Sequence, residues 1–112
     1  MRGKLVSLRE GRPSLEVPGG KIVWLEGDAD TRRVLLDERL QGEDFEARGE
    51  SGGAGTFAIL PIHLRALFVH RDGKRFMITY WCEVCAIRTY TPGVCACCQE
   101  EMALDLRAPG EP

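Results

Sequence analysis

The sequence predicts a mainly β protein with one short helix, built as a small, partly open β-barrel that is followed by a cysteine-rich β-hairpin module. Three observations support this prediction. Short runs that mix apolar and polar residues are separated by glycine- and proline-containing breakers, as is typical of short strands. One stretch has the capping residues and the apolar side of a helix. All five cysteines lie between Cys82 and Cys98.

The first strands are expected at residues 4–8, 14–17 and 21–25. Glycine and proline interrupt the chain between them, at residues 11–13 and 18–20. Each run mixes apolar and polar side chains, which is the pattern of a strand with one buried face. We therefore expect a meander of half-buried strands.

The helix is expected near residues 30–41. Asp28 and Asp30 can cap its start, where the helix dipole favours negative charge. Residues 34–36 supply an apolar side, and Gly42 can end the helix.

Strands are expected to return after the helix, at residues 44–48, 56–62, 66–70 and 75–81. The pair Asp72-Gly73 between the last two is a strong hairpin signal, and residues 49–55 form a glycine-rich loop. This order of strand, helix and strand resembles small bacterial OB-type domains over residues 3–65. The resemblance implies an OB-like, partly open barrel.

The chain is therefore divided into an OB-like β-domain at residues 1–79, a metal-binding ribbon at residues 80–106 and a frayed tail at residues 107–112. The predicted strand at residues 75–81 runs into Cys82 without a Gly, Pro or Ser linker. We expect the ribbon to be rigidly docked on the β-domain, so that removal of the metal also loosens this strand.

The cysteines form two C-x2-C pairs, Cys82 with Cys85 and Cys95 with Cys98, separated by nine residues. Two residues between thiolates let one tight turn aim both sulfur atoms at the same ion. Two such turns complete a tetrahedral site of four sulfur ligands, which suits zinc. The sequence thus predicts one zinc ion per chain, with iron or copper as weaker alternatives.

The fifth cysteine, Cys97, leaves the ligand set open. It can replace Cys98, add a further ligand, or stand beside the site as a small buried residue or an accessible thiol. Cys98 is favoured because the spacing from Cys95 to Cys98 repeats that from Cys82 to Cys85.

Residues 80–104 resemble the short heavy-metal-binding domain of copper-transporting ATPases and metal-efflux adaptors, and they equally resemble zinc ribbons. The resemblance rests on Tyr80 before the first pair, on Pro92-Gly93 before the second pair and on Met102 after it. Cys85 departs from that pattern because it occupies the position of a histidine. The arm between the pairs is about a residue shorter, and the methionine lies farther from the second pair. A fourth thiolate favours a closed zinc site over an exchangeable copper site.

Composition and charge narrow the function classes. Apolar residues make up 44% and charged residues 29% of the chain, which are globular values. The longest uncharged stretch, residues 51–63, is too short to span a membrane. No apolar stretch follows Met1, so we expect no secretory signal and a cytoplasmic protein, or a periplasmic or secreted one if the chain is a processed form.

An enzyme is not expected, because the sequence has no identifiable Ser–His–Asp set, close carboxylate pair or phosphate loop. His63 and His70 are expected at the surface or in hydrogen bonds. We expect a small metal-binding protein or interaction module with structural zinc, for which a protein partner is considered but no physiological partner is identified.

Two alternatives come from other function classes. The first is an OB and zinc-ribbon nucleic-acid-binding protein, because basic and aromatic residues mix at Arg71, Lys74, Arg75, Phe76, Tyr80 and Trp81. The net charge of −2 disfavours it. The second is handling or sensing of zinc or copper through Cys97 and Met102.

Overall fold

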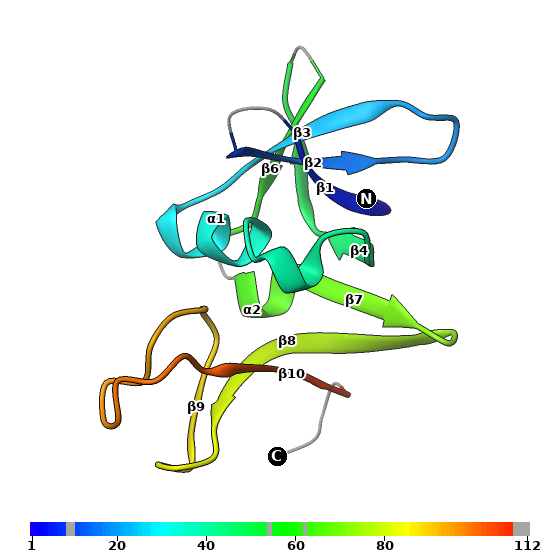
Figure 1. Ribbon diagram of the computed structural model, residues 1–112. Coiled ribbons are helices and arrows are strands. Elements are labelled where there is room, and N and C mark those ends of the chain that lie inside the picture. Colours follow the sequence, from blue (N-terminus) through cyan, green and yellow to red (C-terminus); the bar gives the residue numbers. More distant parts are fainter. Residues whose placement is uncertain (9–10, 54, 62, 109–112) are drawn as a thin grey trace.

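The computed structural model describes residues 1–8, 11–53, 55–61 and 63–108 and is mainly β (Figure 1). The strands are β1 (Arg2–Leu8), β2 (Arg12–Glu16), β3 (Ile22–Glu26), β4 (Asp44–Ala47), β5 (Gly49–Ser51), β6 (Thr56–Ile59), β7 (Leu67–Arg71), β8 (Lys74–Cys82), β9 (Ile87–Thr89) and β10 (Ala103–Arg107). The helices are α1 (Ala29–Leu35), the 3-10 helix η2 (Glu38–Leu40) and α2 (His63–Ala66).

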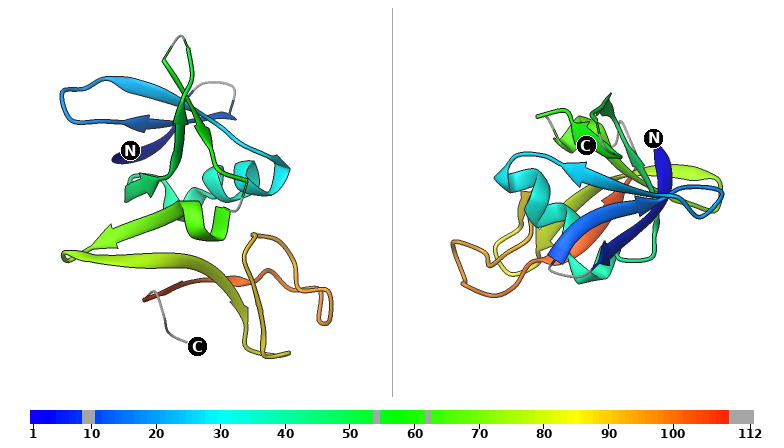
Figure 2. Two further views of the ribbon diagram at one scale, coloured as in Figure 1. Left: turned by 180° about the vertical axis from the view of Figure 1, so that it is seen from behind. Right: turned by 90° about the horizontal axis from the view of Figure 1, so that it is seen from above.

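The described strands pair in the order β10-β8-β7-β4-β1-β2-β3-β6-β5, and β9 pairs with β8 beside this path. The terminal strands of the path, β10 and β5, do not pair with each other, so the sheet is open and does not close into a barrel. Figures 1 and 2 show β1–β3 and β6 at one end of the molecule and β8–β10 at the other, with α1 between them. No helix in the described residues is long and apolar enough to cross a membrane.

The longest strand, β8, connects the core to the cysteines. Its residues Ile78, Tyr80 and Cys82 are all buried and belong to the core cluster, as alternation along a strand requires. Leu35 of α1 and Leu40 of η2 are fully buried in the same cluster. The strand that packs against the core therefore ends at the first cysteine.

The predicted helix is present in two parts. Asp28 caps α1 as predicted, because its carboxylate accepts a hydrogen bond of 2.8 Å from the backbone N–H of Thr31. The α-helix ends at Leu35, earlier than predicted. Asp37 then caps the separate 3-10 helix η2. The second cap interrupts a stretch whose apolar periodicity alone indicated one continuous helix.

The hairpin between β7 and β8 forms at the predicted turn. Asp72 has a φ of +52° and Gly73 a φ of +76°, so both central residues are left-handed, as in a two-residue type I′ turn. A turn of this type requires positive φ values, and this requirement explains why an Asp-Gly pair indicates a hairpin.

Two predicted boundaries in the middle of the chain were wrong. The glycine-rich loop expected at residues 49–55 begins with the strand β5, which pairs with β6. The strand expected at residues 56–62 ends at Ile59, and residue 62 lies outside the described residues. Pro61 lacks the backbone N–H that a continued ladder would need.

The end of the chain also differs from the prediction. Arg107 is the last residue of β10 and pairs opposite Met77, so it does not belong to a frayed tail. The rest of the predicted tail lies outside the described residues from residue 109 onward. The apolar residues Leu104 and Leu106 pack against the core, which explains why this segment is a strand.

Candidate metal centre

The first C-x2-C pair forms the loop of a β-hairpin. Cys82 ends β8 and pairs opposite Ile87 at the start of β9. Cys85 lies in the turn between them, and Ala86 directly after it has a φ of +52°. A left-handed residue at this point reverses the chain tightly, so both thiols stay on the same turn.

The second pair has the same backbone design. Gln99, directly after Cys98, has a φ of +62°. The N–H of Gln99 donates to the carbonyl of Cys95 over 2.8 Å, and the N–H of Cys95 donates to the carbonyl of Glu100 over the same distance. The residue after the second cysteine is therefore left-handed in both turns, although neither position is a glycine.

The two turns bring four sulfur atoms together. The Sγ atoms of Cys82, Cys85, Cys95 and Cys98 all lie within 4.8 Å of one another. Those of Cys82 and Cys98 are 3.4 Å apart. In a tetrahedral site with sulfur atoms about 2.3 Å from zinc, neighbouring sulfur atoms lie about 3.8 Å apart. The cluster thus has the dimensions of a four-thiolate metal site.

Backbone N–H groups of the second turn point at its sulfur atoms. Hydrogen bonds from the N–H groups of Cys98 and Cys97 lower the pKa of Cys95 to about 7. The N–H of Glu100 acts in the same direction on Cys98, but the hydrogen bond with Cys82, burial and Cys95 outweigh it, so the pKa of Cys98 is raised. Such donors stabilise the negative charge that four thiolates bring to a divalent ion.

The fifth thiol lies outside the set of four. Cys97 is exposed, whereas Cys82 and Cys95 are buried. Interaction with the thiol of Cys97, together with burial, raises the pKa of Cys85 well above its usual range. The structure groups Cys98, not Cys97, with the other three cysteines.

A partly buried network connects the ribbon to η2. The hydroxyl of Tyr80 donates to the carboxylate of Asp37 over 2.7 Å, and Arg39 forms an ion pair of 2.9 Å with the same carboxylate. Arg39 also donates to the backbone carbonyl of Met102 over 2.9 Å. Burial and the hydrogen bond to Asp37 raise the pKa of Tyr80 far above its usual range. The sequence analysis did not predict this network, because Asp37 and Tyr80 are 43 positions apart in the chain.

Two further hydrogen bonds hold the arm between the cysteine pairs. Arg33 of α1 donates to the carbonyl of Pro92, and Nε2 of His63 donates to the carbonyl of Tyr90 over 3.0 Å. Met102 is buried, and its sulfur accepts a hydrogen bond of 3.4 Å from the hydroxyl of Thr89. The ribbon therefore contacts the helices both at its arm and at Tyr80 and Met102.

The remaining candidates from the sequence are two histidines and the basic and aromatic residues of the β7–β8 hairpin, and none of them belongs to the cluster of four cysteines. His70 is hydrogen-bonded to Glu46 over 2.8 Å. Tyr80 is fully buried, and the guanidinium of Arg88 covers the ring of Trp81 at 4.9 Å from its centroid. The basic and aromatic residues of the β7–β8 hairpin therefore do not form one open stacking surface.

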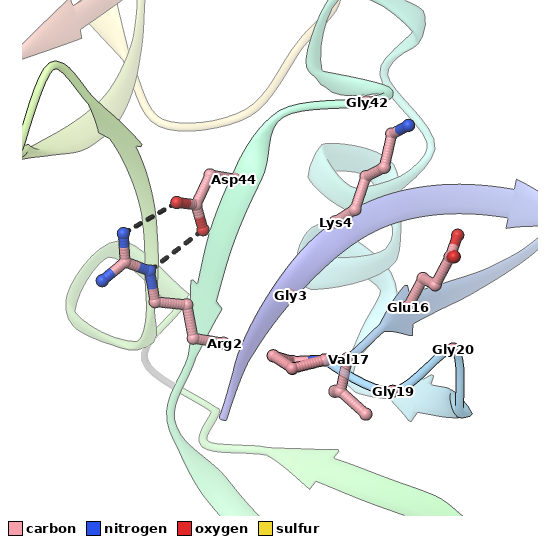
Figure 3. A pocket seen from close by; sticks show the side chains of 10 residues that line it. Arg2, Gly3, Lys4, Glu16, Val17, Gly19, Gly20, Gly42 and Asp44 are labelled. Atoms are coloured by element: carbon pink, nitrogen blue, oxygen red, sulfur yellow. Dashed lines mark hydrogen bonds and ion pairs between the residues drawn. The ribbon is translucent and has the colours of Figure 1, made fainter.

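A separate groove of about 730 Å³ lies beside β1 and the turn between β2 and β3 (Figure 3). Backbone at Gly3, Gly19 and Gly20 forms part of its wall. Arg2 and Asp44 form an ion pair of 2.7 Å at its side. Its lining contains no cysteine or histidine, so it is not part of the candidate metal centre.

Comparisons with known proteins give no relative for this chain: no family model matches it, and neither curated proteins nor solved structures match it significantly.

Proposed function

We propose that this chain is a small zinc-binding protein whose four-thiolate centre, formed by Cys82, Cys85, Cys95 and Cys98, is structural. The observation that carries the proposal is the approach of four sulfur atoms to within 4.8 Å of one another from two turns of the same backbone design. Four thiolates leave no open position for water or substrate, which favours a structural ion over a catalytic one. The ordered ribbon is then an interaction module for a protein partner.

In this proposal the metal stabilises the folded ribbon. Between Cys82 and Cys98 the side chains in or packed against the core cluster are those of the four cysteines themselves, and Val84 and Val94 are 75% and 67% exposed. A segment with so few buried apolar side chains needs another source of folding free energy. Metal binding supplies it, because the unfolded segment has no preformed site.

Metal analysis of purified protein tests the proposal. We expect about one zinc per chain, and loss of that zinc in Cys82→Ser and in Cys95→Ser. The matched control is Cys97→Ser, which removes a thiol from the same turn and should keep the zinc. Iron measured in the same samples tests the alternative that the four cysteines hold iron instead of zinc. Metal-free protein with an unchanged fold would contradict the proposal.

The pairing of the strands in the β-domain supports its assignment as an OB-like fold. Only Arg48 separates β4 from β5, so the segment 44–51 pairs with β1 at its start and with β6 at its end. β6 in turn pairs parallel to β3. A three-stranded meander, a helix and two returning strands in this order correspond to the strand plan of an OB fold.

Metal handling is a second candidate, which the position of Cys97 favours. An exposed thiol in contact with Cys85 could enter the coordination shell while another ligand leaves. Zinc transfer to a competing chelator should then be slower in Cys97→Ala than in the parent chain. An unchanged transfer rate would remove this candidate and leave the structural role.

A further inference from the structure

A hollow of about 210 Å³ opens beside the proposed metal centre. Cys82 and Cys98, whose sulfur atoms lie 3.4 Å apart, are both part of its lining. Trp81 and Val84 form apolar parts of the wall. The hollow therefore gives access from solvent to two of the four proposed ligands, although Cys82 itself is only 6% exposed.

The rim of this hollow is acidic. Glu83, Glu100 and Glu101 line it, and none of its lining residues is basic. Glu83 and Glu100 form no ion pair within the part of the chain that the structure describes. Glu101 is partly compensated, since it lies close enough to Arg39 to contribute to the raised pKa of that guanidinium.

The charge of the metal centre adds to that of the rim. A divalent ion with four thiolates has a formal charge of about −2. The unpaired carboxylates of Glu83 and Glu100 bring two further negative charges to the same opening. A field of one sign over a concave opening attracts ions of opposite charge and repels those of the same charge.

We infer that the metal enters and leaves the centre through this hollow as a hydrated divalent cation, and that Glu83 and Glu100 steer it there. The inference rests on the proposed function and names the chemical form in which the metal reaches the site. Each water ligand leaves the ion as a thiolate binds it, and the proton of any thiol that becomes a ligand passes to solvent. The two carboxylates act only on approach, because four thiolates complete the coordination.

The steering can be measured on the zinc-loaded protein with two probes of opposite charge. The first probe is hydrated Cd²⁺, whose replacement of zinc is followed by cadmium–thiolate absorption after rapid mixing. The second is EDTA, an anionic chelator, whose removal of zinc is followed by metal analysis of the separated protein. The double variant Glu83→Gln/Glu100→Gln should keep one zinc per chain. At about 10 mM ionic strength, where the Debye length is about 30 Å, its cadmium exchange should be roughly threefold slower or more and its loss of zinc to EDTA faster.

The matched control is Glu16→Gln/Glu50→Gln, which changes the net charge equally. Both control residues are exposed, on β2 and β5, and these strands lie at the end of the molecule opposite the ribbon (Figure 1). The control should leave both rates close to those of the parent chain. In about 1 M salt, where the Debye length is about 3 Å, all three proteins should converge.

The opposite signs of the two effects distinguish steering from loosening. A merely loosened site would release zinc faster to both probes, and that result would overturn the inference. Equal rates in the parent chain and the rim variant would also overturn it, while leaving the proposed zinc centre intact. Purified protein without zinc would refute the proposed function and the route together.

Discussion

Asp37 is one of the residues that join the ribbon to the helices. Its side chain is 5% exposed and accepts hydrogen bonds from Tyr80 and Arg39. Burial alone would raise the pKa of Asp37, but the hydrogen bonds from Arg39 and Tyr80 outweigh it and the pKa is lowered. A group with a folded-state pKa below its unfolded value stabilises the fold above the unfolded pKa, and this contribution is lost as the pH falls through the folded pKa.

Asp37→Asn should lower the free energy of unfolding by about 1–3 kcal/mol at pH 7, because the buried hydroxyl of Tyr80 and the guanidinium of Arg39 lose a charged acceptor. Asparagine is also a good helix cap, so the variant isolates the charge from the cap of η2. Urea unfolding in a descending pH series measures the effect. The difference from the parent chain should narrow as the pH falls below about 4, the ordinary pKa of aspartate, toward the lower pKa of Asp37 in the folded protein. A difference that stays constant with pH would show that the charge of Asp37 is not its cause.

At the scale of elements, β8 belongs to two different pairings. Residues 74–77 of β8 pair with β7, whereas residues 77–81 pair with β10 and residues 80–82 pair with β9. Of these partner strands, β9 and β10 belong to the ribbon, whereas β7 belongs to the β-domain. Metal removal should therefore affect the two parts of β8 differently.

Hydrogen exchange with and without chelator tests this coupling. Residues 78–81 and 103–107 should lose protection when zinc is removed, because their ladder partners lose their anchor. Residues 74–77 should remain slow, since β7 still pairs with them. This outcome refines the sequence-based expectation that the whole strand at residues 75–81 loosens. Unchanged protection at residues 78–81 would mean that the ribbon is an independent appendage.

The pairing of β5 with β6 requires a glycine at one position. A Cβ at Gly49 would lie 1.9 Å from the carbonyl oxygen of Ala58, so the strands approach each other too closely for a side chain. Gly49→Ala should lower the free energy of unfolding by about 1–3 kcal/mol, measured by urea unfolding. Gly53→Ala is the matched control, because a Cβ at Gly53 meets no atom within 4 Å. Equal stabilities of the two variants would contradict the close pairing of β5 and β6.

Local signals in the sequence predict the elements better than they predict their docking. The caps of α1, the Asp72-Gly73 hairpin and the C-x2-C pairs act over a few residues, so they can be recognised without the fold. The strand β10 was missed because its ladder partner in β8 is distant in sequence. The hydrogen bonds that dock the ribbon were missed for the same reason.

For the whole molecule, the distribution of charge and aromatic surface argues against nucleic-acid binding. The hollow beside the proposed metal centre is lined by three glutamates and no basic residue, Tyr80 is fully buried, and Arg88 covers Trp81. Phosphate would be repelled at this hollow, and neither Tyr80 nor Trp81 offers a freely open ring for stacking of bases. In gel-shift titrations at low salt, single-stranded DNA and RNA should remain unbound at micromolar protein. Salt-sensitive binding in that range would contradict this account.

The central claim is that four cysteine sulfur atoms enclose one zinc ion. X-ray absorption at the zinc edge of the purified protein tests it most directly, because it reports the number, type and distance of the ligands. We expect four sulfur atoms at about 2.3 Å and no nitrogen or oxygen in the first coordination shell. Cys97→Ser should give the same spectrum as the parent chain. A shell with fewer than four sulfur atoms, or with a nitrogen or oxygen ligand, would contradict the closed site formed by Cys82, Cys85, Cys95 and Cys98.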